Sequence, residues 1–182
     1  MRPFKAMYNV ASFLVRAELT GLAKEVVIKG IRQAHRNNGP SDDAPPPARS
    51  GDKKTYRVVD VSGGKLSSVD TEFGDAEAFR GVEGGEAVLV TLRVEKTDGG
   101  KGMAAYIHGR RVGWYTHQRV PLLVHSDFEW MKRLHRGGFH PRFKGIYLAQ
   151  QGKGHQVYFL MPSPSSLPSV GECRNFFRES AG

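Results

Sequence analysis

The side chains best suited to chemistry in this sequence are basic and aromatic, and they gather in one β-rich stretch. The basic members are Arg93, Lys101, Arg110, Arg111 and Arg119, and the aromatic members are Tyr106, Trp114 and Tyr115. Binding to a nucleic-acid strand requires cations that follow the phosphates and flat rings on which bases stack. We therefore expect these residues to bind nucleic acid, with single-stranded DNA as the favoured ligand. The alternative is that the rings pack in a core and the arginines form a solvated face.

Other kinds of site find less support in the residue pattern. The glycine-rich stretches GVEGGE and TDGGKG do not match the phosphate-cradling pattern G-x-x-x-x-G-K-[ST]. His125, His135 and His140 lack the spacing and the neighbouring carboxylates or thiolates of a metal site. Cys173 is the only cysteine and has no histidine close in sequence. The sequence therefore predicts a protein that is not an enzyme and that holds neither a metal nor a cofactor.

The positive charge is distributed unevenly along the chain. The formal net charge is +9, and residues 87–162 contribute +8, from twelve basic and four acidic groups. Residues 55–86 contribute −4, from three basic and seven acidic groups, and residues 1–38 contribute +5. A field of this sign attracts polyanions. The charge therefore favours a nucleic-acid ligand for the region after residue 86.

Composition divides the chain into four segments. We expect a basic amphipathic helix within residues 1–38, a flexible linker at 39–54, a β-rich domain at 55–162 and a tail at 163–182. A single cysteine cannot form an intramolecular disulfide, and the amino-terminal apolar run is too short for a membrane span. We therefore expect no membrane span, and a location in the cytoplasm, in an equally reducing compartment or in a virion.

The amino-terminal segment has apolar residues at helical spacing, with basic residues between them. The apolar face predicts a helix over residues 9–36, which Thr20-Gly21 kinks or divides. A basic amphipathic helix on a flexible tether can lie on an anionic membrane, coat nucleic acid, or dock in a groove of a partner or on a second copy of the chain, and docking on a protein is favoured. We expect that contact to use Leu14, Leu22, Val26 and Ile31. The alternative is that the helix packs back on its own domain.

Alternating apolar residues predict the strands of the β-rich domain. The clearest run is 87–96, in which Val88, Val90, Leu92 and Val94 face a core. Further strands are predicted at 55–61, 103–108, 111–115, 143–149 and 156–161, and Gly109-Arg110 is predicted as the two-residue loop of a hairpin. A helix at 127–136 follows a capping box of Ser126 and Glu129. The expected fold class is mainly β with one α-helix in the domain, built as a barrel or the edge of a sandwich.

Several of these segments together resemble the HIRAN domain, a small β-barrel module. The opening strand Val58-Val59-Asp60-Val61-Ser62-Gly63 resembles the family's valine–glycine strand, and Gly109-Arg110-Arg111-Val112-Gly113-Trp114 resembles its G-x-x-[VI]-G-[YW] hairpin. Ala104 to Ile107 and the ending Leu160-Met161-Pro162 extend the resemblance over about residues 56–162.

The resemblance implies binding of single-stranded DNA at a free 3′ end, through stacked aromatic rings and polar clamps. The chain departs from the family at Gly64-Lys65-Leu66 and at Thr97 to Lys101. Recognition of a strand end depends on those positions more than the fold does. The expected function is therefore a non-catalytic nucleic-acid-binding accessory module. The alternative is a structural or protein-interaction subunit, for example of a viral or replication assembly, whose barrel does not contact nucleic acid.

Overall fold

The structure is a computed structural model of the 182-residue chain. It describes residues 21–37, 45–48, 55–71, 76–97, 100–115, 125–150 and 154–181. All structural statements below concern these residues.

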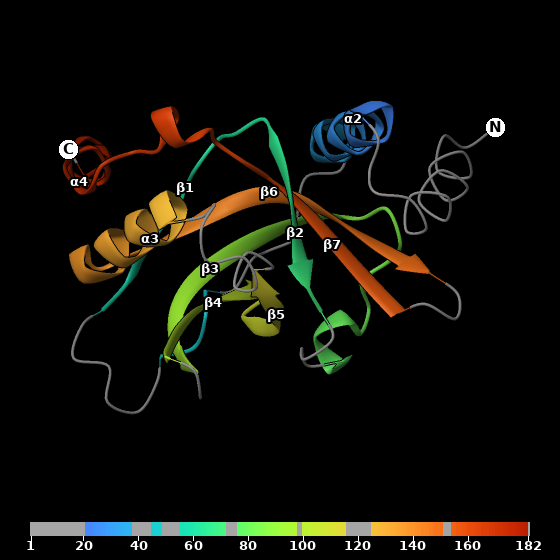
Figure 1. The fold of residues 1–182 in the computed structure, drawn as a ribbon, viewed down its shortest axis with the longest axis horizontal. Coiled ribbons are helices and arrows are strands. Elements are labelled where there is room, and N and C mark those ends of the chain that lie inside the picture. The colour runs from blue at the N-terminus through green and yellow to red at the C-terminus, as the bar shows by residue number, and fades with distance from the viewer. Residues whose placement is uncertain are drawn as a thin grey trace.

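Six antiparallel strands close into a barrel (Figure 1). Around the barrel they follow the order β6 (Phe139–Gln150), β3 (Ala87–Thr97), β4 (Gly100–Ile107), β5 (Arg110–Tyr115), β2 (Lys65–Asp70) and β7 (Gly154–Met161). The ring closes because β7 also pairs with β6, from Gly145 opposite Phe159 to Gln150 opposite Gly154. A short strand, β1 (Arg57–Asp60), adds in parallel to the free side of β6. The described residues thus confirm a barrel that is mainly β with some α.

The barrel interior is filled by the residues that alternate inward along each strand. Val88, Val90 and Leu92 of β3 are fully buried, and they pack with Phe143 of β6 and Phe159 of β7. The period of two in β3 therefore predicts the inward face correctly. The strand β2 was not predicted, because Lys65–Asp70 has only two apolar residues, Leu66 and Val69.

Two α-helices pack at one end of the barrel. The first, α3 (His125–Gly137), buries Trp130, Met131 and Leu134 against the core and confirms the helix predicted at 127–136. Ser126 is the second residue of α3 instead of the residue before it. The second, α4 (Val170–Glu179), begins at a complete capping box of Ser169 and Glu172 and follows a short 3₁₀ turn, η3 (Pro164–Ser166). Another 3₁₀ turn, η1 (Ala76–Phe79), precedes β3.

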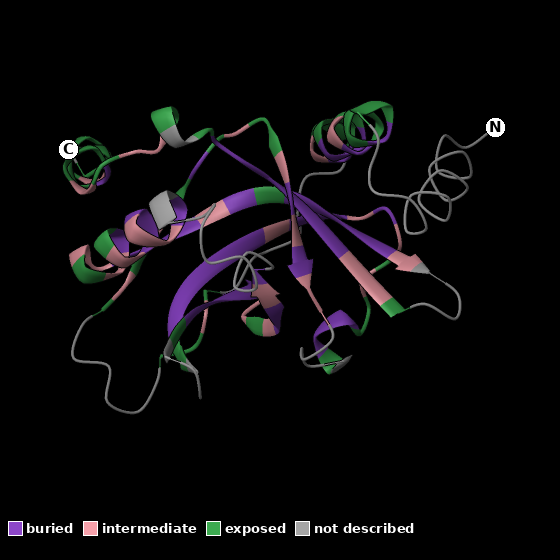
Figure 2. Cartoon of the chain, in the orientation of Figure 1, coloured by how far each residue is buried: buried purple, intermediate pink, exposed green. Residues whose placement is uncertain are grey.

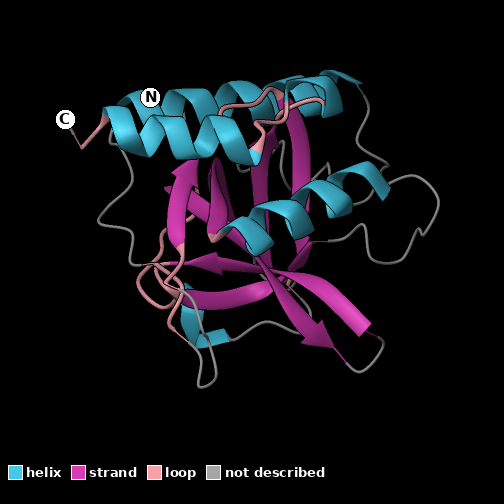
Figure 3. Ribbon diagram, turned by 90° about the vertical axis from the view of Figure 1, so that its left-hand side faces the viewer, coloured by secondary structure: helices cyan, strands magenta, loops and turns pink. Residues whose placement is uncertain are grey.

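The remaining described α-helix, α2 (Gly21–Asn37), lies across the outside of the barrel (Figures 1 and 3), and Figure 1 shows it away from α3 and α4. Its buried residues Ala23, Val27, Ile31 and Ala34 pack in one cluster with residues of β3, β6 and β7, namely Ala87, Ile146, Leu148, Tyr158 and Leu160. Figure 2 shows the exposed residues of α2 on the side away from the strands. The apolar face that was expected to bind a partner therefore packs on the chain's own barrel.

The residues predicted to contact a partner differ in their exposure to solvent. Ile31 has no exposed surface, so the expectation that it contacts a partner is wrong in this structure. Leu22 is 78% exposed and Val26 is 37% exposed, so these two side chains remain accessible. Leu14 lies outside the described residues, as do 39–44 and 49–54 of the predicted linker.

The hairpin between β4 and β5 turns one residue earlier than predicted. Its two loop residues are His108 and Gly109, with φ of 50° and 71°, and Arg110 already pairs with Ile107. Two consecutive positive φ values are typical of the type I′ turn, which matches the twist of the two strands. Glycine is needed at the second loop position, so the predicted loop Gly109-Arg110 is corrected to His108-Gly109.

Candidate nucleic-acid interface

Three of the predicted nucleic-acid contacts are inaccessible in the structure. Tyr115 points into the barrel, where its hydroxyl donates to Met161 Sδ over 3.4 Å, and burial raises its pKa to about 12. Tyr106 and Arg93 lie on the outer side of the strands but are only 5% and 3% exposed. A buried ring cannot stack on a base, and a buried guanidinium cannot follow a phosphate strand. These placements correct the expectation for Tyr106, Tyr115 and Arg93.

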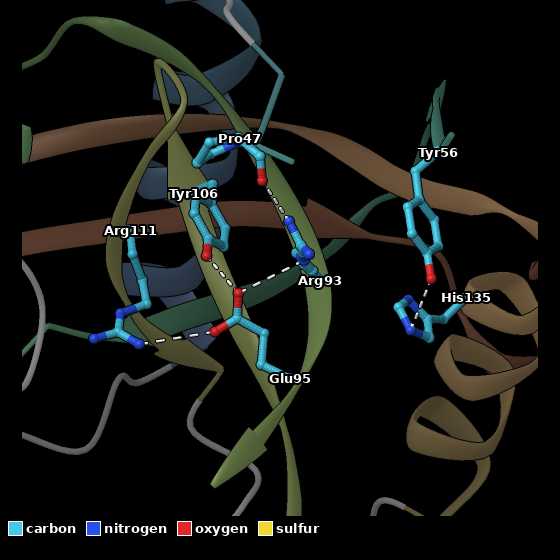
Figure 4. A network of polar contacts seen from close by, with 7 residues as sticks. All are labelled: Pro47, Tyr56, Arg93, Glu95, Tyr106, Arg111 and His135. Atoms are coloured by element: carbon cyan, nitrogen blue, oxygen red, sulfur yellow. Dashed lines mark hydrogen bonds and ion pairs between the residues drawn. The ribbon is translucent and has the colours of Figure 1, made fainter. Parts of the chain in front are cut away.

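The buried pair Arg93 and Tyr106 belongs to a polar network centred on Glu95 (Figure 4). Glu95 Oε1 accepts a hydrogen bond from the Tyr106 hydroxyl and lies 3.7 Å from Arg93 Nε. Glu95 Oε2 lies 3.7 Å from Arg111 Nη1. The Glu95 side chain is 1% exposed, so its burial depends on the Tyr106 hydrogen bond and on the two ion pairs. Arg93 and Arg111 thus share the charge of one carboxylate within the protein.

The accessible predicted residues do not share one face. Trp114 is half-buried and lies under the Arg111 guanidinium, 5.4 Å from the ring centre. Arg110 donates from Nη1 to Glu77 O of η1 over 3.0 Å, at the hairpin end of β5. Lys101 is exposed. Because side chains alternate along a strand, it lies on the same face of β4 as the inward residues Met103 and Ala105. Arg119 lies outside the described residues.

A more continuous positive surface lies on α2 and the strands beside it. The cations that are exposed there are Lys24, Lys29, Arg32 and Arg36 of α2 and Lys144 of β6. Within the part of the chain that the structure describes, none of these five side chains forms a hydrogen bond or an ion pair. The only acid on α2 is Glu25. We call these five residues the α2 basic surface.

Two contacts place this helix relative to the strands. Arg32 lies beside Gly64, since a methyl group at Gly64 would be 3.6 Å from Arg32 Nη2. At the other side, His35 Nε2 donates to Gly145 O over 2.8 Å, next to Lys144. Lys29, Arg32 and Arg36 follow three-and-four spacing, so they form one stripe on the helix. The stripe is therefore presented on a docked helix, with Lys144 beside it.

The imidazole of His35 couples this docking to pH. Burial lowers the pKa of His35 and the nearby Lys144 lowers it further, against a rise from the hydrogen bond to Gly145. The docked helix favours the neutral imidazole. The contribution of His35 to the free energy of unfolding is therefore fully present above its ordinary pKa of about 6.5 and is lost as the pH falls below that value. The only carboxylate on α2 is that of Glu25, ten residues before His35 in the sequence.

We expect the free energy of unfolding to decrease between about pH 7.5 and about pH 5 by more in the wild type than in His35→Gln. The glutamine amide keeps a donor for Gly145 O but does not titrate. Urea unfolding at both pH values measures the difference, and the variant corrects for the carboxylates that titrate over the same range. An equal loss of stability in both proteins would show that His35 does not control the docking.

The structure also bears on the cysteine, on metal ligands and on membrane-spanning helices. Cys173 is buried in α4, and burial raises the pKa of its thiol, with Glu172 adding to the rise. No cluster of three or more His, Cys, Asp or Glu residues suited to a metal occurs among the described residues. The helices within the described ranges include none that is long and apolar enough to cross a membrane.

Comparisons of the chain with protein-family models, with curated proteins and with solved structures gave no match.

The residues of the α2 basic surface were only partly recognisable from the sequence. The basic residues of α2 stand out between its apolar positions, but the expected site was placed in the β-rich stretch because rings and cations lie close together there. Lys144 lies 109 residues after His35 in the sequence, and only the docking of α2 on β6 brings it beside the helix.

Proposed function

We propose that the chain is a non-catalytic module that binds nucleic acid through the α2 basic surface. The observation that carries the proposal is the group of five exposed cations that have no acidic partner among the described residues. Binding of a polyanion releases counterions from its phosphates, and cations that are not already paired gain most from this contact. From Lys24 to Arg36 the helix spans about 18 Å, enough to contact several successive phosphates.

The α2 basic surface supports contact with the backbone more than with the bases. The helix contains no Phe, Tyr or Trp, and Tyr158 beneath it is only 7% exposed. Affinity should therefore follow charge density, so duplex DNA is expected to bind at least as tightly as a single strand. The closed barrel supports the resemblance to HIRAN domains. Recognition of a strand end would require rings such as Trp114, which lies on β5.

A salt titration tests the proposal. If about four phosphates are contacted, the logarithm of the binding constant should fall against the logarithm of salt concentration with a slope of about −3. Fluorescence anisotropy with labelled single-stranded and duplex oligonucleotides measures the slope. Trp114→Ala should leave the affinity within about twofold, because α2 packs mainly on β6, β7, β2 and β3.

Two outcomes would contradict the proposal. A steep loss of single-strand binding in Trp114→Ala would place the site on β5. No measurable binding at low salt would favour the second candidate, a structural or protein-interaction subunit. That candidate is supported by the exposed apolar residues Leu22 and Val26, which are neighbours on α2, and by Phe176 of α4, which is 57% exposed.

A further inference from the structure

The outer face of β3 and β4 is buried where a barrel exterior normally meets water. Thr91, Arg93 and Glu95 of β3 are 2–4% exposed, and Ala104 and Tyr106 of β4 are at most 5% exposed. These residues alternate with the core-facing ones, so they point away from the barrel interior. We call this group of five the β3–β4 outer face. Its burial means that other parts of the chain cover it.

A proline-rich segment of the chain lies on this face. The carbonyl oxygen of Pro47 accepts a hydrogen bond of 2.7 Å from Arg93 Nη1, and Figure 4 shows Pro47 beside Arg93 and Tyr106. The described part of this segment, residues 45–48, has no helical or strand structure; Pro46 is half-buried, whereas Pro45, Pro47 and Ala48 are exposed. Part of the region predicted as a flexible linker therefore contacts the barrel through the Pro47 carbonyl.

Three consecutive prolines restrict the conformation of this segment. Each proline ring fixes φ near −65°, and a residue that precedes proline is held in the extended region. Pro45 and Pro46 both precede a proline, so they favour the polyproline II conformation. Such a segment has no internal hydrogen bonds and few N–H donors, so its carbonyls are the groups available to a receptor. An Arg93 side chain that donates to one of these carbonyls matches this chemistry.

The protein holds Arg93 in position for that contact. Glu95 lies 3.7 Å from Arg93 Nε and is itself held by the Tyr106 hydroxyl and by Arg111. The arrangement leaves Arg93 Nη1 directed at the Pro47 carbonyl. Two buried charges on a barrel exterior are costly unless they are paired and hydrogen-bonded. Their presence here indicates a built site with a fixed donor beside a tyrosine ring.

We propose that the β3–β4 outer face is a binding site for proline-rich peptides, and that residues 45–48 occupy it as a ligand from the same chain. Proline-rich ligands dock on surfaces that combine aromatic rings with donors to the peptide carbonyls. A proline-rich segment of a partner protein would therefore compete with residues 45–48 for Arg93. This site is separate from the α2 basic surface, so the inference does not depend on nucleic-acid binding.

The test uses a labelled peptide of residues 43–50, DAPPPARS, added to the full chain. In the variant in which Pro45, Pro46 and Pro47 are replaced by glycine, the internal ligand is weakened and the site becomes available. Because a tethered ligand acts at an effective concentration of about millimolar, the peptide should bind this variant at least about tenfold more tightly than the wild type. The control peptide, with its three prolines replaced by glycine, should not bind.

Amide chemical shifts locate the binding and supply a second measurement. Addition of the peptide to the variant should shift the signals of Ala104 and Tyr106 while leaving those of α4 unchanged. In the wild type, an excess of peptide should displace residues 45–48 and move the Ala48 amide toward its disordered position. Equal peptide affinity of the two proteins, or no displacement of the Ala48 signal at millimolar peptide, would overturn the proposal.

Discussion

Reversal of three charges on α2 should reduce nucleic-acid affinity by at least roughly a hundredfold at low salt. The change is Lys29→Glu together with Arg32→Glu and Arg36→Glu, which replaces the stripe of the α2 basic surface by three acids. All three side chains are exposed, so the barrel should keep its stability. Lost phosphate contacts and new repulsion should act together, and the remaining binding should depend only weakly on salt. Anisotropy at several salt concentrations measures both effects.

A matched variant separates the position of the charges from their number. Arg133→Glu, Arg174→Glu and Arg178→Glu change exposed residues of α3 and α4. Each replacement changes the charge by two, so both triple variants lower the formal net charge from +9 by six, to +3. We expect the α3–α4 variant to lose less than about tenfold in affinity. Equal losses in the two variants would show that binding follows the total charge and not the α2 basic surface.

The strands of the barrel could be predicted because their signal is local. Val88 to Val94 alternate with a period of two, and both halves of the hairpin around Gly109 have short β-rich runs. The strand β2 escaped prediction because its inward residues include Ser67, which is polar although it is 6% exposed. Pairing with β5 and β7 decides its structure, and neither partner is near in sequence.

Two errors of the sequence-based prediction have a common cause. Tyr106 and Arg93 were expected on the surface, but a face of a strand is exposed only if nothing else covers it. Part of that cover is the Pro47 backbone, 46 residues before Arg93. Likewise, Ile31 lies against the barrel because Ile146, Leu148 and Tyr158 offer an apolar outer surface. Contacts of this kind depend on the tertiary fold and leave no local pattern in the sequence.

The helix α4 shows the opposite case, a signal that was present in the sequence. Ser169 and Glu172 have the S-x-x-E spacing of a capping box, and both reciprocal hydrogen bonds form. The prolines and serines of 163–170 indicate irregular structure there, and no helix is predicted for the short segment that follows. Phe177 then packs face to face with Phe139 at 5.8 Å between ring centres. The same capping rule that was applied to Ser126 would have predicted α4.

The two glycines that carry the resemblance to HIRAN domains have a physical explanation. A methyl group on Gly113, of the G-x-x-[VI]-G-[YW] hairpin, would lie 2.0 Å from the backbone oxygen of Asp70 on β2. A methyl group on Gly63, at the end of the valine–glycine strand, would lie 2.1 Å from the carbonyl carbon of Met161 on β7. Both positions place one backbone directly against another where the barrel closes. Glycine is therefore required at these two positions because another backbone segment lies directly against each of them.

Replacement of Gly63 by alanine should accordingly destabilise the barrel by about 3 kcal/mol or more. The obstructing atoms are backbone atoms of Met161 and Pro162, which cannot rotate away as a side chain can. For a chain of this size, that loss corresponds to a decrease in the unfolding temperature of roughly 6–12 °C. Thermal and urea unfolding followed by circular dichroism measure the effect.

The adjacent residue provides the control for this prediction. A methyl group on Gly64 would meet only the end of the Arg32 side chain, at 3.6 Å, and Gly64 does not have a positive φ. Gly64→Ala should therefore change the free energy of unfolding by less than about 1 kcal/mol. Similar stability of Gly63→Ala and Gly64→Ala would mean that the end of β7 does not approach Gly63 as the structure places it. The closure of the barrel beside α2, on which the docked position of the α2 basic surface depends, would then have to be revised.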